Sequence, residues 1–537
     1  MTAEIARPGP IGAGNAPTVT ERIRAALSQP ELYPHRPATV DVRETHISWV
    51  FLAGERAYKL KKPLTLDFVD YGTPARRRQM CAEEVRLNRR LAPDIYLGVL
   101  GITATADRVA LTAEDDPRAI EFVVEMRRYD EDLTLAARLD RGELEREDIV
   151  AVARALARFH SRSRRVPAGA PVLTAERRFE RNLHELLGCV EQRGELDRVL
   201  ALERFAHAFI VAHAQTFRER ASHGHVREGH GDLRAEHVLV NGDVRIVDCV
   251  EFDPALRELD VADDLAFLVF DLVARGGERF GEMLVQAYRD AGGDPGADAL
   301  IAFYAAYRAL VRAKVAFVRA AQHLAASAAY GQASGHARDL ITLAERFSWR
   351  ARLPLVVVVC GVPASGKSSL AGALAELSGL RRLSSDVTRK RLAGVHSTQP
   401  ASSETYGLEW NARTYAELAR GAVREVAVNS GAIVDATFRH LADRQAFASS
   451  FAATAPLLFI ECQASRSVVA QRAAQREHDR KRVSDADLAV VLRERERWEP
   501  LDEVPANAHV ALRSDRPLDE LVGDVVALLD RRLGRLA

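Results

Sequence analysis

Residues Leu355–Leu377 read LVVVVCGVPASGKSSLAGALAEL, an apolar run followed by a glycine-containing loop and a helical pattern. The loop matches G-x-x-x-x-G-K-[ST] at Gly361, Gly366, Lys367 and Ser368. Glycines let the backbone turn its N–H groups toward a phosphate, and the start of the following helix attracts the same negative charge. Because strand, loop and helix come in the required order, the stretch predicts a phosphate-binding P-loop rather than a chance match.

The P-loop predicts ATP and Mg²⁺ as cofactors. Lys367 is expected to reach the β- and γ-phosphates and to be catalytic, and the Ser368 hydroxyl is expected to ligate Mg²⁺. The loop and the first helical turn supply the predicted ATP contacts, which are Gly361, Val362, Pro363, Ala364, Ser365, Gly366, Lys367, Ser368 and Ser369.

Three charged side chains follow strand patterns farther along the chain. Asp386 and Arg389 lie in RLSSDVTRKRL, residues 382–392, after a short strand, and Asp435 ends the strand in GAIVDATF, residues 431–438. Strands that alternate with helices predict a parallel sheet, and the ligands of such sheets lie at the carboxyl ends of the strands. We therefore expect all three side chains at the same edge as the P-loop.

Arg472 and Arg476 stand one helical turn apart, before a basic run at residues 480–482. Such a helix beside a basic loop is typical of the lid of small P-loop kinases, where arginines stabilise the charge of the moving phosphoryl group. A solvated helix with ion pairs between successive turns would have the same spacing. We interpret both arginines as ATP contacts and keep the solvated helix as the alternative.

From Pro354 to the C-terminus, this order of motifs resembles a family of predicted bacterial P-loop kinases. The wider relatives of that family include gluconate kinase, the zeta toxins, chloramphenicol phosphotransferase and the 5′-kinase domain of polynucleotide kinase. The resemblance implies that Asp386 is the general base, that Arg389 holds an anionic part of the acceptor, and that Asp435 binds the hydration shell of Mg²⁺ or the acceptor. A small-molecule acceptor is expected, and a nucleic-acid 5′-hydroxyl stays open.

A second motif lies upstream, with HGDLRAEHVLV at residues 230–240 and RIVDCVEF at residues 245–252. A His-x-Asp loop, a short strand and a second strand leading into an aspartate are the layout of a protein-kinase-like catalytic loop and metal site. Asp232 would then orient and deprotonate the acceptor hydroxyl, and Asp248 would hold Mg²⁺ against the phosphates. The alternative is that both aspartates cap turns in a domain that binds nothing.

This motif resembles the aminoglycoside phosphotransferase family, in particular members fused to a P-loop kinase, over about residues 20–347. The resemblance implies that Lys59, in AYKLKKP, is the strand lysine that pairs with the α- and β-phosphates, with Lys61 on the same strand face as the alternative. It also implies that Glu84, in CAEEVRLNRRLAP, is the ion-pair partner of that lysine in the ATP site, with Glu83 as the second choice.

One position departs from the pattern of that family, whose catalytic loop has the form H-G-D-x-x-x-x-N. The asparagine binds a second Mg²⁺, and this chain has His237 in its place. A neutral imidazole is a poor ligand for Mg²⁺, which prefers oxygen donors. His237 therefore stays a candidate metal position beside Asp248, with three alternatives: one metal suffices, another oxygen donor substitutes, or phosphoryl transfer is weakened or lost.

At 537 residues the chain is too long for one hydrophobic core. We expect a disordered tail at residues 1–17, an aminoglycoside phosphotransferase-like domain at 18–347, a linker at 348–353 and a P-loop kinase domain at 354–537. The expected fold class is an α+β protein-kinase-like fold followed by an α/β P-loop NTPase fold with a parallel sheet.

The composition limits the partners of the chain. Lys+Arg and Asp+Glu both number 75, and this balance argues against a whole-chain electrostatic grip on nucleic acid or on an anionic membrane. The five dispersed cysteines fit a reducing cytosol, and no apolar run approaches the length of a bilayer span. We expect a cytoplasmic protein without a membrane partner; the sequence carries no signal of its oligomeric state.

Three hypotheses on function follow. The first is a bifunctional ATP-dependent phosphotransferase that acts on hydroxyl groups of small molecules. In the second, only the P-loop half is an active kinase, and the N-terminal half is a pseudokinase that binds a nucleotide or the substrate. The third is an ATPase switch that controls a partner.

Overall fold

The computed structural model describes residues 18–533, apart from residues 67–68, 106–107, 168–173, 191, 324–326, 397, 400, 452–453 and 478–487. The chain divides into two compact units. The first comprises Met1–Val172 and Gly224–Asp294, and the second comprises Leu173–His223 and Pro295–Ala537.

An antiparallel six-stranded sheet, with strand order β1-β2-β3-β8-β6-β7, begins the first unit. Its strands are β1 (Val40–Glu44), β2 (Ser48–Ala53), β3 (Arg56–Lys61), β6 (Tyr96–Ala104), β7 (Val109–Ala113) and β8 (Glu121–Arg127). A hairpin turn at Gly54, which has a φ of 61°, joins β2 to β3.

Helices cover both faces of this sheet. Helix α2 (Pro74–Asn88) packs Cys81 and Val85 against Phe122 and Val124, while α1 (Val19–Leu27) packs on the opposite face. Thr73 caps α2 and Pro74 occupies its first turn, where a missing N–H costs nothing. The sheet thereby holds β3 and α2 together, and these two elements carry the lysines and Glu84.

The rest of the first unit is mainly helical. The hairpin of β10 (Val238–Asn241) and β11 (Asp243–Ile246) lies between the two predicted catalytic segments. The larger helices are α4 (Arg146–Arg162), α9 (Val261–Ala274) and α10 (Glu278–Asp290). The small elements are η1 (Pro30–Leu32), β4 (Thr65–Leu66), β5 (Val69–Asp70), η2 (Glu131–Leu133), α3 (Leu135–Asp140), β9 (Val226–Glu228), η3 (Ala235–His237), α8 (Pro254–Arg257) and β12 (Glu258–Asp260).

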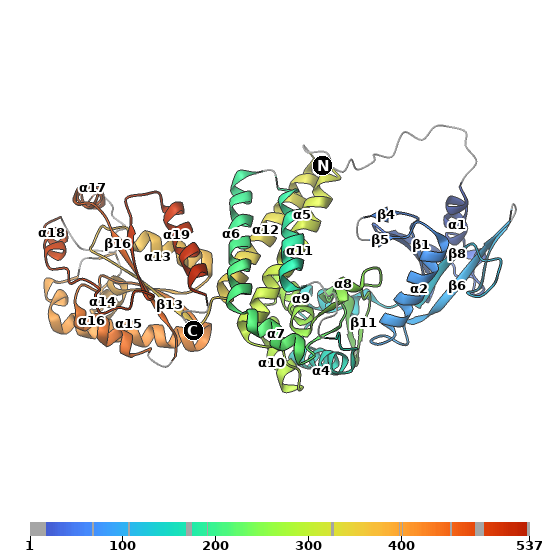
Figure 1. The fold of residues 1–537 in the computed structure, drawn as a ribbon, viewed down its shortest axis with the longest axis horizontal. Coiled ribbons are helices and arrows are strands. Elements are labelled where there is room, and N and C mark those ends of the chain that lie inside the picture. Colours follow the sequence, from blue (N-terminus) through green and yellow to red (C-terminus); the bar gives the residue numbers. More distant parts are fainter. Residues whose placement is uncertain are drawn as a thin grey trace. The chain divides into compact units, whose positions relative to one another are not determined.

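The second unit starts with long helices that run side by side (Figure 1). Aromatic rings fill the space between them, and Phe209 and Phe303 stack with centroids 4.5 Å apart. The helices are α5 (Ala175–Leu187), α6 (Arg193–Ala212), α7 (Ala214–Ser222), α11 (Asp298–Ala321) and α12 (Ala328–Arg350). These helices lie within the predicted domain 18–347 or, in the case of α12, run just past its end, and they belong to the same compact unit as the P-loop half.

The end of α12 explains this grouping. Residues 348–350 of the predicted linker belong to α12, and Trp349 is buried in the hydrophobic core of the P-loop sheet. Arg352 forms a buried ion pair with Asp530, and its guanidinium lies 4.4 Å from the ring centroid of Phe205 in α6. The helices and the sheet therefore share packed side chains, and only a short stretch of chain joins them.

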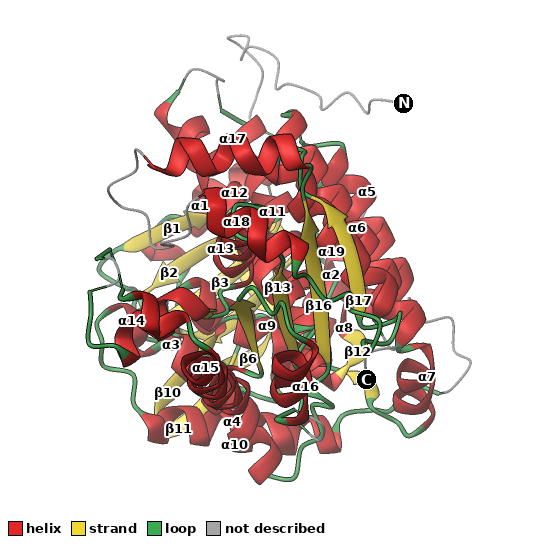
Figure 2. Ribbon diagram, turned by 90° about the vertical axis from the view of Figure 1, so that its left-hand side faces the viewer, coloured by secondary structure: helices red, strands yellow, loops and turns green. Residues whose placement is uncertain are grey.

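The P-loop half is built on a parallel five-stranded sheet with the order β14-β15-β13-β16-β17. Figure 2 shows β13, β16 and β17 side by side. The strands are β13 (Leu355–Cys360), β14 (Arg382–Ser384), β15 (Gly431–Asp435), β16 (Leu457–Gln463) and β17 (His509–Arg513). Every residue of β13 is buried, as its continuous apolar run predicts for a central parallel strand.

Helices cover both faces of this sheet as well (Figure 1). Alternate residues of β13 pack against α13 (Lys367–Ser378) and α19 (Leu518–Arg532) on one face, and toward α15 (Leu408–Asn429) and α16 (Leu441–Ser449) on the other. The remaining elements are α14 (Ser385–Leu392), η4 (Ser403–Tyr406), α17 (Arg466–Glu477) and α18 (Leu488–Glu496).

Within the described part of the chain, none of the helices has both the length and the apolar character that crossing a membrane requires. All five cysteines are free thiols.

Candidate active sites

The P-loop (Gly361–Ser368) turns sharply between β13 and α13. Gly361 has a φ of 141°, and a Cβ there would lie 2.6 Å from the carbonyl oxygen of Cys462. Gly366 has a φ of 95° and Ala364 a φ of 66°, so three residues of the loop adopt the left-handed region. These two glycines are required by the backbone path, as the motif predicts.

Two distant segments hold the backbone of the P-loop. The carbonyl oxygen of Ser365 accepts hydrogen bonds from Ser514 Oγ at 2.6 Å and from Arg472 Nη1 at 3.2 Å. Arg472 Nη2 also donates to the carbonyl oxygen of Ser514 at 2.8 Å. Arg472 was predicted as an ATP contact, and in the structure its guanidinium braces the loop. The side chain of Arg476 lies outside the described residues.

At the start of α13, the predicted phosphate and metal ligands come together. Lys367 is nearly buried, and Ser368 Oγ donates a hydrogen bond of 3.3 Å to Asp435 Oδ1. Arg382 forms an ion pair with the other oxygen of Asp435. A hydroxyl beside a carboxylate is the oxygen donor set that suits Mg²⁺. Ser369, in the same turn, is exposed.

Asp386 and Arg389 lie in α14, directly after β14. Arg389 is 5% exposed, and it donates to the carbonyl oxygen of Thr405 and lies 4.9 Å from the ring centroid of Tyr406. Among the described residues, its Nε is buried without a hydrogen-bond partner. Asp386 and Arg389 both act electrostatically on Tyr415, whose pKa is raised mainly by burial.

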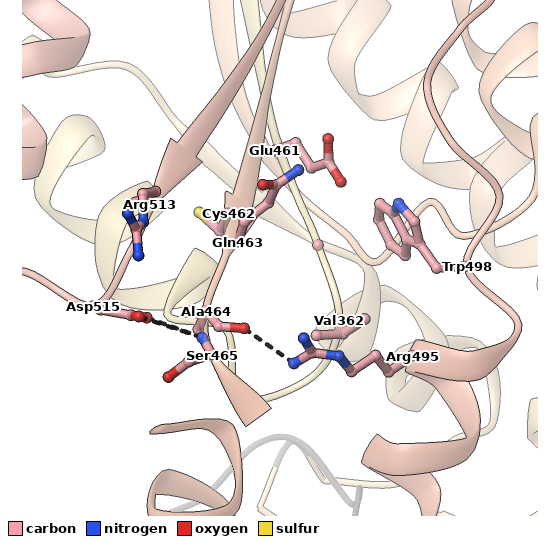
Figure 3. A pocket seen from close by; sticks show the side chains of 11 residues that line it. Val362, Glu461, Cys462, Gln463, Ala464, Ser465, Arg495, Trp498, Arg513 and Asp515 are labelled. Atoms are coloured by element: carbon pink, nitrogen blue, oxygen red, sulfur yellow. Dashed lines mark hydrogen bonds between the residues drawn. The ribbon is translucent and has the colours of Figure 1, made fainter. Parts of the chain in front are cut away.

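A pocket of about 440 Å³ adjoins the start of the P-loop (Figure 3). Trp498 and Arg495 face the ends of β16 and β17 across it, and Arg495 donates to the carbonyl oxygen of Ala464 at 3.1 Å. The lining residues are Gly361, Val362, Glu461, Cys462, Gln463, Ala464, Ser465, Arg495, Trp498, Arg513 and Asp515. Sequence reasoning missed all of these except Gly361 and Val362, and Asp386, Arg389 and Asp435 do not line the pocket.

In the N-terminal half, Lys59 joins two segments of the chain. Its Nζ lies 2.8 Å from Glu84 Oε1 and 2.9 Å from Asp248 Oδ1. Burial alone would lower the pKa of Lys59, but the charges of Asp248 and Glu84 raise it well above its ordinary value. The lysine is therefore a fixed cation at the predicted phosphate position, with Glu84 as its partner. Glu83 instead pairs with Arg86 and Arg257.

Lys61 contacts the same glutamate from a fully buried position. Its Nζ lies 2.7 Å from Glu84 Oε2 and forms a second ion pair with Glu251, which also accepts a 2.6 Å hydrogen bond from Tyr71. Sequence reasoning missed Glu251 and Tyr71. The available signal was a second lysine on a buried strand face, because a buried cation needs a carboxylate partner.

The catalytic loop is fixed by buried hydrogen bonds. Asp264 accepts the backbone N–H groups of His230, at 2.7 Å, and Gly231, at 3.0 Å, and it also contacts the ring of His160. Although burial opposes ionisation, these bonds hold the pKa of Asp264 well below its usual range. Gly231 has a φ of 87°. These bonds thus hold the backbone that leads into Asp232, the predicted base.

Asp232 and Asp248 face each other across Arg234 and His237. Arg234 Nη2 lies 3.0 Å from Asp232 Oδ2 and 3.0 Å from His237 Nε2. His237 Nε2 lies 3.6 Å from Asp248 Oδ2. Asp248 has a φ of 65°, and Lys59 is the main cause that holds its pKa far below the ordinary value. Sequence reasoning missed Arg234, although an arginine two residues after the candidate base was visible.

Parts of the chain match two protein-family models. A family model described as the phosphotransferase enzyme family matches residues 81–303, and one described as an AAA domain matches residues 356–501. The uncharacterized protein Rv2004c of Mycobacterium tuberculosis is 35% identical over 447 residues, covering 81% of this chain and 86% of the relative. The uncharacterized protein Mb2027c of Mycobacterium bovis gives the same values.

Solved structures are similar to parts of the chain. A gluconokinase from Sinorhizobium meliloti 1021 is 25% identical and covers 34% of this chain and 97% of its own, with a TM-score of 0.26. A choline/ethanolamine kinase family protein from Mesorhizobium loti is 16% identical and covers 62% of this chain and 99% of its own, with a TM-score of 0.37.

Proposed function

We propose that this chain, which belongs to the family of these mycobacterial proteins, is a bifunctional ATP-dependent phosphotransferase. The premise is that its two halves belong to phosphotransferase and kinase families. Each half would transfer the γ-phosphate of ATP to a hydroxyl group of a small molecule. The observation that carries the proposal for the N-terminal half is Lys59, held between Glu84 and Asp248.

In the P-loop half, the backbone N–H groups of the loop and Lys367 would hold the phosphates, while Asp386 accepts the proton of the acceptor hydroxyl. Ser368 and Asp435 would hold Mg²⁺, which neutralises phosphate charge when it is bound. Arg389 would hold an anionic part of the acceptor, since its buried Nε needs a partner.

The pocket beside Gly361 is our candidate for the rest of the acceptor site. Its volume of about 440 Å³ lies in the range of small-molecule sites. The carboxylate of Glu461 and the amide of Gln463 suit an acceptor with several hydroxyl groups, and Trp498 offers an apolar face. The substrate of this half would therefore be a polar small molecule.

In the N-terminal half, phosphate oxygens would take the place of Asp248 on Lys59, while Glu84 keeps the lysine in position. Asp232 would accept the proton of the acceptor hydroxyl, and Arg234 beside it would stabilise negative charge on the transferred group. Because Lys59 stays protonated, its contact with phosphate would persist across the physiological pH range.

A second candidate function rests on His237, whose Nε2 is engaged by Arg234 at 3.0 Å. If this contact persists with ATP present, the N-terminal half binds nucleotide without transferring phosphate. Only the P-loop half would then be a kinase.

Turnover of ATP to ADP separates the two candidates. Wild type, Lys367→Ala and Asp232→Ala are assayed against pooled sugars, nucleosides, aminoglycosides and RNA 5′ ends, with Asp243→Ala as the matched control, since that side chain is 85% exposed. We expect Lys367→Ala and Asp232→Ala each to abolish a distinct acceptor-dependent part of the turnover. Turnover by Asp232→Ala equal to that of wild type and Asp243→Ala for every pool would refute a bifunctional enzyme.

A further inference from the structure

The hydrogen bonds of His237 define which of its ring nitrogens carries a proton. Nδ1 lies 2.9 Å from the backbone carbonyl oxygen of Asp232. A carbonyl oxygen can only accept, so Nδ1 carries the hydrogen and donates it. On the other side of the ring, Arg234 Nη2 lies 3.0 Å from Nε2, and a guanidinium can only donate. In this arrangement Nε2 is an acceptor and carries the lone pair of the ring.

The lone pair of Nε2 lies close to a carboxylate. Nε2 is 3.6 Å from Asp248 Oδ2, while the other oxygen of Asp248 is bound to Lys59. Bonds from a first-row metal ion to nitrogen or oxygen are roughly 2.0–2.2 Å long. Two atoms 3.6 Å apart can consequently bind one ion. A ring N–H that donates to a backbone carbonyl is also the usual support of a metal-bound histidine.

The two donors differ in the ions that they favour. Carboxylate oxygen suits both Mg²⁺ and Mn²⁺, whereas imidazole nitrogen is a poor ligand for Mg²⁺ and binds first-row transition-metal ions, among which Mn²⁺ has the lowest affinity. Within the described parts of the chain, no group of three or more His, Cys, Asp or Glu side chains is placed to hold a metal ion. The remaining ligands must come from nucleotide phosphates and water.

We propose that the N-terminal site binds a nucleotide-associated divalent cation through Asp248 Oδ2 and His237 Nε2, and that this nitrogen makes the site prefer Mn²⁺ over Mg²⁺. The inference rests on the proposed function to the extent that ATP supplies the phosphates. Arg234 leaves Nε2 when the ion binds, and it retains its ion pairs with Asp232 and Glu236.

Pulsed electron paramagnetic resonance with Mn²⁺ and a non-hydrolysable ATP analogue tests the ligand directly. The full-length chain carries Lys367→Ala, which removes the charged phosphate contact of the P-loop, and is prepared with unlabelled and with ¹⁵N-labelled histidine. We expect a ¹⁴N coupling that the label converts to ¹⁵N. His237→Asn, which offers an oxygen of similar reach, should bind Mn²⁺ without that coupling. His230 also lies in the catalytic loop, but its Nε2 is bound to the carbonyl of Val247, so the His237→Asn result identifies the ligand.

Competition between Mn²⁺ and Mg²⁺ gives a second readout. The preference for Mn²⁺ should fall by roughly tenfold or more in His237→Asn, in line with the cost of disturbing a metal ligand shell. Equal preference in the two proteins, or bound Mn²⁺ without a histidine coupling, would overturn the inference and leave the kinase proposal standing. Absence of any Mn²⁺–nucleotide complex in the Lys367→Ala chain would overturn both the inference on the metal ligand and the proposal that the N-terminal half is a kinase. If the histidine coupling is present but Asp232→Ala turns over ATP as wild type does, only phosphoryl transfer by the N-terminal half is refuted. The inference on the metal ligand then stands.

Discussion

Replacing Lys61 with methionine removes a positive charge that lies between two buried carboxylates. The side chain of Lys61 is fully buried, and those of Glu84 and Glu251 are 1% and 5% exposed. Removing one partner of a buried ion pair costs about 3–5 kcal/mol, because the remaining charge has no solvent to stabilise it. Lys59 still neutralises part of Glu84, so we expect a loss near the lower end, about 3 kcal/mol.

Hydrogen exchange of the amides in β3 and α2, followed by mass spectrometry, measures this loss locally. A loss of about 3 kcal/mol raises the opening constant of these segments by more than about a hundredfold. Lys62→Met is the matched control, because Lys62 is the next residue and its partner Glu44 is 55% exposed. Such a surface pair contributes about 1 kcal/mol or less.

A companion variant isolates the buried charge from the loss of packing. In Lys61→Met with Glu251→Gln, the uncompensated carboxylate is neutral, so part of the lost protection should return. The reasoning fails if Lys61→Met raises exchange no more than Lys62→Met does. It also fails if the double variant exchanges as fast as Lys61→Met alone.

Three further predictions concern the two sites. Gly361→Ala should lower P-loop-dependent turnover by about a hundredfold, because the new Cβ would lie 2.6 Å from the Cys462 carbonyl and displace the loop; unchanged turnover in the acceptor assay would contradict this. Gln463→Ala should raise the KM for the acceptor of the P-loop half without changing the KM for ATP, as steady-state kinetics would show. A rise in the KM for ATP alone would mean that the pocket holds the adenine of ATP instead of the acceptor. Burial lowers the pKa of His230 from 6.5 to about 4, so the unfolded chain binds its proton first as the pH falls. Between pH 6.5 and 4 the wild type should therefore lose about 3 kcal/mol more unfolding free energy than His230→Gln in urea titrations, and parallel curves would contradict the prediction.

The P-loop was predictable because its signals are local. LVVVVC and the spaced glycines define the strand, the loop and the helix within a short stretch of chain, and the structure has β13 and α13 at those residues. The approach of Asp435 to Ser368 also followed from the sequence, since parallel strands end at one edge of their sheet.

Contacts between distant segments were not predictable in the same way. Lys59 and Lys61 share one strand face, so the alternation of the strand could not distinguish them; what separates them is Asp248 on one side and Glu251 on the other. Helix α6 likewise carries its buried apolar residues, among them Phe205, at helical spacing along one face. That pattern does not say which core receives the face, and in the structure Phe205 packs under Arg352 of the P-loop half.

The carbonyl group of Ser365 has a consequence for how the protein is made. Both of its hydrogen-bond donors come later in the sequence, and Ser514 follows it by 149 residues. A chain emerging from the ribosome therefore exposes the glycine-rich loop long before the groups that brace it exist. The phosphate cradle reaches its final shape only after Ser514 has been synthesised, so the nucleotide site of this half matures well after its own loop has left the ribosome.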